Sequence, residues 1–322
     1  MTSRLRAVLA AAGLAGAAML LPCLAAGAPP AGGAVADPEG VIVSELVVQA
    51  KEPGPAWWRV SDADTTVYIL GMPDGPVPRG VAWDRSVLER RLTGANAAIG
   101  APGFTAGLRD LPAVLRLRAQ LKSKTPMEAQ LPPALAARYA ADAARGGKKP
   151  GRYDSWQPLA AGAFLLQEAR GGWAPLDPQV RSAARRHGLK LKSSQRYAAM
   201  PLVQTAMAGM TPAVQQQCLG WALDDVEAGE APARRALDGW ARGDTAVALT
   251  EPRGFDRCLQ VLSGGADLWA RISQDEANDI AAALKAPGHA VAVVGLRRLL
   301  ARDGVIERLE AKGLTVKGPG EP

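Results

Sequence analysis

The chain has 322 residues, of which 48% are hydrophobic and 21% charged, and its formal net charge is +7. This composition excludes fibrous and intrinsically disordered proteins and fits one large globular domain or two smaller ones. The only short basic run, 146–152, is rich in glycine and proline. It could contact phosphate or an anionic surface, but no aromatic-rich nucleic-acid module accompanies it. We therefore interpret it as a solvated loop and expect no nucleic-acid partner.

Residues 1–28 have the pattern of a signal peptide. Two arginines precede the apolar run 7–21, and small residues follow it, as in a cleavable export signal. We therefore expect a periplasmic or secreted protein. Cys23 leaves a lipoprotein as the alternative, although Pro22 stands where a lipid-modification site needs a small residue. No later segment approaches the ~20 apolar residues of a membrane span, so we expect none in the mature chain.

If the chain is exported, its two remaining cysteines lie in an oxidising compartment. Cys218 and Cys258 lie on the predicted helices 213–228 and 255–262, and an even pair in an oxidising compartment predicts a disulfide. Two buried free thiols remain the alternative, because sequence alone does not show whether the two helices meet.

The first predicted structural unit follows a linker, 29–40, that is rich in proline, glycine and alanine. Apolar runs within 41–48 predict one or two short strands. The next elements predict a unit of strand, turn, helix and strand: a hairpin of 57–60 and 65–70, a turn at 71–74, a helix over 83–92 and a strand at 97–99.

The same order of elements returns at the end of the chain. It comprises a strand at 289–294, a turn at 295–298, a helix over 303–312 and a strand at 314–316. The middle of the chain, about 111–285, is punctuated by Pro and Gly at helix boundaries and predicts a helical insertion, with one more short strand at 189–192. We therefore expect an α/β fold: a single domain, 41–318, with a mixed central sheet built from both terminal units.

The two terminal units carry a resemblance to a known family. The segment from Pro55 through Gly71, followed by Trp83 and 94–97, resembles the opening of TraB/GumN proteins, which are relatives of the Tiki metalloproteases. The segments 290–295, 303–305 and 312–316, together with Leu309, resemble the closing motif of that family. The resemblance covers most of the mature chain and implies the fold given above.

The resemblance also implies a site, from which this chain departs. Family members carry a histidine three residues after Gly71 and another three residues after Gly295, with acidic residues between them, proposed to bind a divalent metal for peptide hydrolysis. Here the first position is Asp74 and the second is Arg298. The positions of the two expected glutamates fall near Ala101 and near Gln195.

These departures matter because a hydrolytic metal site needs about three neutral or anionic ligands around one ion, with an open position for water. The permanently charged guanidinium of Arg298 repels a cation and favours an anion. We therefore expect no metal and no cofactor at this site, and we hypothesise a salt bridge between Arg298 and Asp74.

The other chemistry-bearing residues do not replace the site. His187 ends a helix after two arginines and His289 precedes a strand, so we expect structural or solvent roles for both. No Gly-x-Ser-x-Gly elbow occurs. We expect an exported scaffold, catalytically inactive, that binds a peptide, a protein or a small anion. The alternative is a metal-dependent peptidase or hydrolase with a rebuilt site that uses Asp74.

Overall fold

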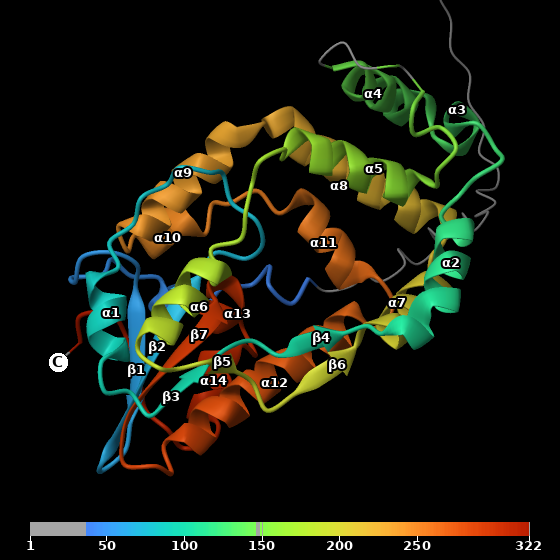
Figure 1. The fold of residues 1–322 in the computed structure, drawn as a ribbon. Helices are drawn as coiled ribbons and strands as arrows, with labels where there is room; N and C mark the ends of the chain where they lie inside the picture. Colours follow the sequence, from blue (N-terminus) through green and yellow to red (C-terminus); the bar gives the residue numbers. More distant parts are fainter. Residues whose placement is uncertain (1–36, 146–148, 150, 322) are drawn as a thin grey trace, which may run out of the picture. The chain divides into compact units, whose positions relative to one another are not determined.

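The computed structural model describes residues 37–145, 149 and 151–321. The predicted signal peptide, most of the predicted linker and much of the basic run 146–152 lie outside the described residues. Residues 36–322 form one compact unit. Figure 1 shows its arrangement as a sheet with helices packed against it and a group of further helices beyond.

The central sheet is mixed and has six strands, in the order β5-β3-β7-β2-β1-β8. Their bounds are β1 Trp57–Ser61, β2 Thr65–Met72, β3 Ala97–Ile99, β5 Leu191–Lys192, β7 Gly288–Gly295 and β8 Val316–Lys317. β2 and β7 are parallel neighbours, although more than two hundred residues of sequence separate them. Strands from the beginning and the end of the chain therefore complete one sheet, as predicted.

The strands form where the sequence is richest in β-branched and apolar residues. β2 and β7 are buried on both faces over much of their length, which explains why their sequences are nearly continuous apolar runs rather than alternating ones. β1 is antiparallel to β2, and the tight hairpin between them sets the register in which Trp57 faces Leu70.

Helices cover the sheet. α1 (Ser86–Leu92) packs on α6 (Asp177–Arg186) and on β7, and α12 (Gly265–Ala283) packs on α14 (Val305–Glu310) and on β3 and β7. The crossover from β2 to β3 and the crossover from β5 to β7 run in opposite directions along the sheet. Because such crossovers are right-handed, α1 and α12 lie on opposite faces.

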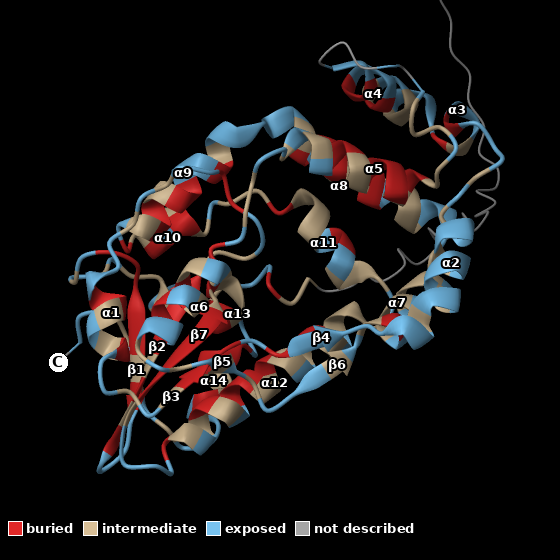
Figure 2. Ribbon diagram, viewed as in Figure 1, coloured by how far each residue is buried: buried red, intermediate tan, exposed pale blue. Residues whose placement is uncertain are grey.

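The middle of the chain is largely helical, as predicted. Its helices are α2 Leu111–Gln120, α3 Met127–Gln130, α4 Pro133–Ala144, α5 Pro158–Ala169, α7 Ala199–Ala208, α8 Pro212–Ala228, α9 Glu230–Ala241, α10 Thr245–Ala248 and α11 Gly254–Val261. α5, α4 and α8 share a second, smaller core around Leu165, Leu219 and Leu223. Figure 2 shows the buried faces of α5 and α8 in red, in contrast to α2, which is largely exposed.

The predicted disulfide is confirmed. Cys218 of α8 and Cys258 of α11 are bonded, with their Cα atoms 5.1 Å apart, and both residues are fully buried. The bond ties α11, which leads toward the sheet, to the helical layer.

Two local predictions differ from the structure, and one small element was not predicted. Residues 41–48 form no strand; a short 3-10 helix, Ser44–Leu46, lies there between single bridges to Ala301 and Asp244. Residues 296–300 are the helix α13 rather than part of a turn. A small parallel ribbon of β4 (Gly103–Thr105) and β6 (Arg196–Ala198) was not predicted. These short segments lack the long periodic patterns on which sequence prediction depends. Among the described residues, no helix is long and apolar enough to cross a membrane.

Candidate functional site

The two turns that carry Asp74 and Arg298 leave the same edge of the sheet. β2 and β7 are parallel, with Gly71 opposite Val294 and Met72 opposite Gly295. Their carboxyl ends therefore meet, which is the edge where open α/β sheets place their ligand sites. The tertiary structure thus brings together the two residues that the sequence singled out.

Two glycines permit this close approach. A Cβ at Gly71 would lie 2.7 Å from Cδ1 of Leu296 and 3.0 Å from the Trp58 ring. A Cβ at Gly295 would overlap the carboxylate of Asp74 and lie 3.2 Å from Nη2 of Arg298. The Asp74 and Arg298 side chains therefore both border the Cα of Gly295, and glycine is required there for steric reasons rather than for its backbone freedom.

The guanidinium of Arg298 is bound by Glu276 of α12. Its Nε donates to Oε2 at 2.8 Å and its Nη2 donates to Oε1 at 3.1 Å, and the Glu276 side chain is 1% exposed. Although burial lowers the pKa of a guanidinium, the pairing with Glu276 outweighs it and raises the pKa of Arg298. Arg298 is therefore a fixed positive charge at this edge of the sheet.

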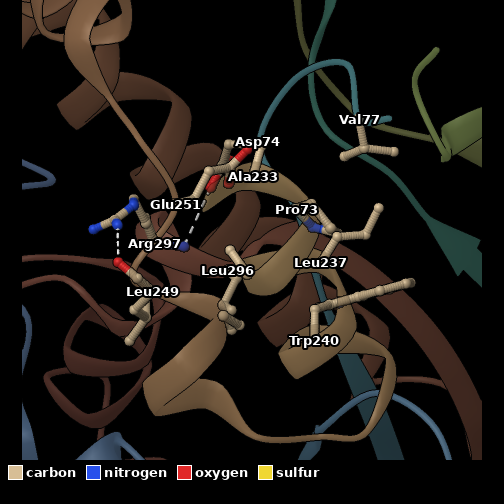
Figure 3. A pocket seen from close by; sticks show the side chains of 12 residues that line it. Pro73, Asp74, Val77, Ala233, Leu237, Trp240, Leu249, Glu251, Leu296 and Arg297 are labelled. Carbon is tan, nitrogen blue, oxygen red and sulfur yellow. Dashed lines mark hydrogen bonds between the residues drawn. The ribbon is translucent and has the colours of Figure 1, made fainter. Parts of the chain in front are cut away.

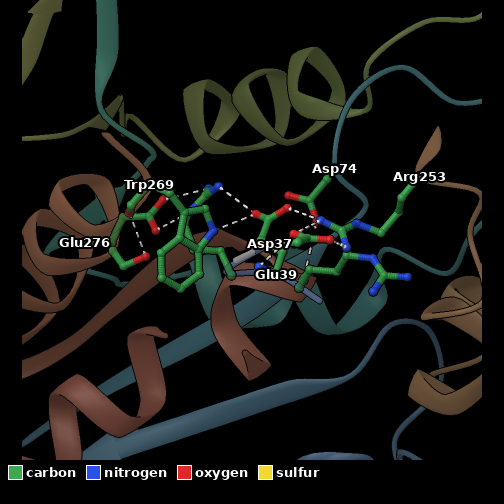
Figure 4. A network of polar contacts seen from close by, with 9 residues as sticks. Asp37, Glu39, Asp74, Arg253, Trp269 and Glu276 are labelled. Atoms are coloured by element: carbon green, nitrogen blue, oxygen red, sulfur yellow. Dashed lines mark hydrogen bonds and ion pairs between the residues drawn. The ribbon is translucent and has the colours of Figure 1, made fainter. Parts of the chain in front are cut away.

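Glu39 extends this pair into a network (Figure 4). Oε1 of Glu39 accepts a hydrogen bond from Nε1 of Trp269 at 2.9 Å and lies 3.9 Å from Nη1 of Arg298. Its Oε2 accepts from Nη2 of Arg253 at 3.1 Å, and Arg253 also donates to both carboxylate oxygens of Asp37, at 2.7 and 3.0 Å. Cations and carboxylates therefore alternate from Glu276 to Asp37.

This network includes residues that we expected to belong to the linker. Asp37 and Glu39 lie within the expected linker 29–40, yet Glu39 is 6% exposed and both side chains bind Arg253. Sequence reasoning missed Glu39 because isolated acids in a proline- and glycine-rich segment carry no periodic signal. It also missed Glu276, which occupies a position of the buried stripe of α12 together with Trp269, Ser273, Ala277 and Ile280. A charged residue in an apolar stripe is the signal that could have identified it.

The hypothesised salt bridge between Asp74 and Arg298 is wrong. No ion pair joins these two residues, which are both described. Arg298 donates to Glu276, and its Nη1 lies 3.9 Å from Oε1 of Glu39. Oδ2 of Asp74 instead accepts a weak hydrogen bond from the backbone N–H of Arg297, at 3.3 Å. The two side chains interact through their charges at longer range, since Arg298 lowers the pKa of Asp74.

Asp74 titrates near neutral pH. Burial is the main cause that raises its pKa from the ordinary 3.8 to about 7, and the negative charge of Glu39 acts in the same direction. The opposing effects of Arg298 and of the Arg297 backbone N–H are smaller. At neutral pH the Asp74 carboxyl is therefore divided between its protonated and ionised forms.

A second carboxyl shares this environment. Glu251 has its pKa raised to about 8, first by burial and then by the negative charges of Asp74 and Asp256. Asp74 and Glu251 line the same small cavity with Arg297, whose guanidinium donates to the carbonyl of Leu249 (Figure 3). The cavity holds about 20 Å³, which is room for a single water molecule.

The remaining wall of this cavity is apolar. It consists of side chains from the turn after β2 and from α9, α10 and α13: Pro73, Val77, Ala233, Ala236, Leu237, Trp240, Ala248, Leu249 and Leu296. Nε1 of Trp240 donates to the carbonyl of Gly71 at 2.7 Å, which fixes this wall against the end of β2. The wall is therefore closely packed, while Asp74 beside it remains partly exposed.

The other predicted site position lies elsewhere. Gln195 is exposed in the loop between β5 and β6, where its backbone N–H contacts Oγ of Ser193 and its carbonyl accepts from Gly103. No hydrogen bond or ion pair of the described residues joins Gln195 to Asp74 or Arg298. The two histidines have the local roles that we expected: His187 contacts Glu89, and His289 contacts the carbonyl of Arg91.

The donor set does not suit a divalent metal. Within the described ranges, no group of three or more His, Cys, Asp and Glu side chains has the arrangement of a metal site. The carboxylates nearest to Arg298 are those of Glu276 and Glu39, and both are bound by arginines or by Trp269. A cation would therefore have to displace guanidinium groups from their partners.

The model of the TraB/PrgY/gumN family matches residues 56–318, which is most of the chain. The chain belongs to the TraB/PrgY/gumN family. The match begins at β1 and ends just after β8, so it contains the whole six-stranded sheet of this TraB/PrgY/gumN protein. No curated protein and no solved structure matches the chain.

Proposed function

We propose that this TraB/PrgY/gumN protein is exported and has lost metal-dependent hydrolysis, so that it acts as a binding or regulatory scaffold for a peptide, a protein or a small anion. The observation that carries the proposal is the bidentate pair of Arg298 with Glu276, at 2.8 and 3.1 Å, where the family resemblance places a metal-binding histidine. A guanidinium provides no lone pair to a cation, and its charge opposes the approach of one.

The surrounding network supports the same proposal. Trp269 and Arg253 donate to the carboxylate of Glu39, and Arg298 donates to that of Glu276, whose side chain has almost no contact with solvent. An ion pair with that burial and geometry is costly to open, because each partner would be left as an unpaired buried charge. The charge network therefore supports a site held together by ion pairs and not by a metal.

Metal titration tests the proposal. We expect calorimetry with Zn²⁺ and with Mn²⁺ to give no stoichiometric binding, and we expect no hydrolysis of unstructured peptides in the presence of either ion. Stoichiometric binding that disappears in Asp74→Ala, and persists in the control Glu310→Ala on the exposed face of α14, would contradict the proposal.

A second candidate function rests on Asp74 itself. A carboxyl with a pKa of about 7, next to Glu251 with a pKa of about 8, has the proton affinity of a general acid or base at neutral pH. This favours the alternative of a hydrolase with a rebuilt site. The cavity beside the two carboxyls holds about 20 Å³, so a substrate would require the α9 and α10 wall to move.

Peptide hydrolysis distinguishes the two functions. The rebuilt hydrolase requires a rate that follows a pH profile with an inflection near 7 and that falls at least a hundredfold in Asp74→Asn. The scaffold requires the same negligible rate in both proteins at every pH.

A further inference from the structure

A row of large apolar side chains is exposed at the start of the helical middle region. Leu108 is 93% exposed, Leu111 55%, Val114 43% and Leu115 60%. None of the residues of α2 is buried, and Figure 2 shows this helix almost entirely in the exposed and intermediate colours. Exposed contiguous apolar side chains of this size mark a surface that another partner covers.

The exposed row has helical spacing. Leu108, Leu111 and Leu115 are three and four residues apart, so they form a ridge along one side of α2 and the short turn before it. Leu117 and Leu121 lie on a neighbouring side of the same helix and line an apolar groove against α7. Leu117 and Leu121 therefore line the groove, whereas the ridge of Leu108, Leu111 and Leu115 is exposed to solvent.

The apolar groove lies beside the ridge and is a separate feature. It has a volume of about 740 Å³ and is lined by side chains from α2, α7, α11 and α12, among them Leu121, Met207 and Leu259. Leu108, Leu111 and Leu115 are not part of its lining. The ridge is thus a convex feature beside the groove and not a wall of it.

The charges around the ridge are almost all positive. Between residues 104 and 124 the cations are Arg109, Arg116, Arg118, Lys122 and Lys124, all of them exposed. The single acid in that segment, Asp110, accepts a hydrogen bond from the backbone N–H of Gly107. None of these cations has a carboxylate partner among the described residues. Nζ of Lys122 lies 3.7 Å from the centre of the Trp156 ring, so the charges most open to an anionic surface are those of the three arginines and Lys124.

We propose that the ridge of Leu108, Leu111 and Leu115, with the arginines and lysines around it, docks this protein on an anionic phospholipid bilayer. Exposed leucines together with cations that have no carboxylate partner provide both contacts that an anionic bilayer surface offers, apolar and electrostatic. The leucines enter the boundary between head groups and acyl chains, while the cations contact lipid phosphates.

Charge and shape favour a bilayer over the other occupants. A second copy of this chain, meeting the first through the same surface, would bring equivalent arginines together, and like charges oppose such a contact. An acidic helical peptide would bury its apolar side in the groove and would leave the convex ridge exposed. A bilayer is deformable and covers a convex apolar ridge without a matching cavity. The proposal is independent of the candidate site, since none of its residues belongs to that site.

Vesicle binding tests the proposal. The protein from residue 36 onward, which is the compact unit, is used so that the apolar run 7–21 does not contribute. We expect it to sediment with vesicles of phosphatidylglycerol and phosphatidylethanolamine, and to bind vesicles of phosphatidylcholine at least tenfold more weakly. We expect 0.5 M NaCl to release it from the anionic vesicles.

Substitutions locate the surface. We expect Leu108→Glu and Leu111→Glu each to weaken binding to the anionic vesicles about tenfold, because each removes a leucine side chain that the bilayer would bury. We expect Arg116→Glu to weaken it roughly fivefold or more. Leu108 is 93% exposed, so its replacement leaves the fold intact.

Matched controls change the same residue types elsewhere. Val41→Glu alters an exposed apolar side chain outside the ridge, and Arg235→Glu alters an exposed arginine on α9; both should bind like the unaltered protein. Absence of binding to anionic vesicles, or equal binding by Leu108→Glu, overturns the proposal. Concentration-dependent dimers, or capture of an acidic amphipathic peptide, that depend on Leu111 without any vesicle binding also overturn it.

Discussion

Arg298 and Glu276 form a bidentate ion pair across the boundary between α13 and α12, with N–O distances of 2.8 and 3.1 Å. α13 directly follows β7, and α12 precedes the loop that leads into β7. The ion pair therefore ties the end of β7 to the helix that packs on this strand. The site that the resemblance associates with hydrolysis therefore contributes to the cohesion of the fold in this chain.

The first prediction concerns the loss of one partner of this pair. We expect Arg298→Ala to lower the free energy of unfolding by about 3–5 kcal/mol, because it leaves the buried carboxylate of Glu276 without its cation. Urea denaturation followed by circular dichroism measures the change. Arg302→Ala, an exposed arginine close by in sequence, should stay within about 0.5 kcal/mol of the unaltered protein.

Replacing both Arg298 and Glu276 distinguishes the effect of an unpaired charge from the effect of lost packing. We expect the double variant Arg298→Met with Glu276→Leu to recover most of the lost stability, since no buried charge then remains unpaired in this pair. A double variant that is as unstable as Arg298→Ala would show that the pair acts through something other than charge compensation.

The second prediction concerns residues 37–40. Glu39 accepts a hydrogen bond from Trp269 and contacts two arginines. We therefore expect the free energy of unfolding of a chain that starts at residue 41 to be about 2–4 kcal/mol lower than that of a chain that starts at residue 36. Thermal and urea unfolding of the two truncated chains measure the difference. Equal stability would mean that the acidic segment adds nothing to the core.

The third prediction concerns the pH dependence of Asp74. Its pKa is raised in the fold to about 7 from an ordinary 3.8, so between those values the folded chain holds a proton that the unfolded chain has lost. The contribution of Asp74 to stability is therefore complete below about pH 4 and is lost as the pH rises to 7, with a slope of at most about 1.4 kcal/mol per pH unit.

Asp74→Asn tests this dependence because it cannot ionise. We expect its free energy of unfolding, measured with urea from pH 4 to pH 8, to fall less steeply than that of the unaltered protein. The exposed substitution Glu310→Gln should leave the slope unchanged. Parallel curves for Asp74→Asn and the unaltered protein would rule out a proton on Asp74 near neutral pH.

The fourth prediction concerns the disulfide. The bond closes a loop across a sequence separation of 40 residues, for which the chain-entropy relation gives about 4 kcal/mol. We expect Cys218→Ala with Cys258→Ala to lower the free energy of unfolding by about 2–4 kcal/mol, and a reducing agent to have a comparable effect on the unaltered protein. A reducing agent that also destabilises the double variant would point to another cause.

The long periodic elements could be predicted from the sequence, and the short ones could not. The β1–β2 hairpin and β7 are apolar runs bounded by turn residues, and the helical middle is punctuated by proline and glycine, so their positions follow from local chemistry. The segment 41–48 was misassigned as strand because its apolar residues satisfy a strand pattern locally. Its actual partners are far away in the sequence: Ile42 forms a single bridge with Ala301, and Val48 hydrogen-bonds with Thr245.

The candidate site was also predicted only in part. The sequence identified Asp74 and Arg298 and the glycines beside them, because a motif position is a local property. It gave the wrong partner for Arg298, since a charge pairs with whichever opposite charge the fold brings within reach, and Glu276 and Glu39 come from α12 and from the segment before β1.

The sequence by itself determined the family resemblance, the terminal strands, the cysteine pair and the absence of a histidine at the two motif positions. Only the tertiary structure decided which carboxylates hold Arg298, why Asp74 keeps a proton near pH 7, and which side of α2 remains exposed. The physical reason is that ion pairing, desolvation and exposure depend on distances between segments that are remote in the chain. Local composition fixes which elements form, and their packing fixes the energy of each charge.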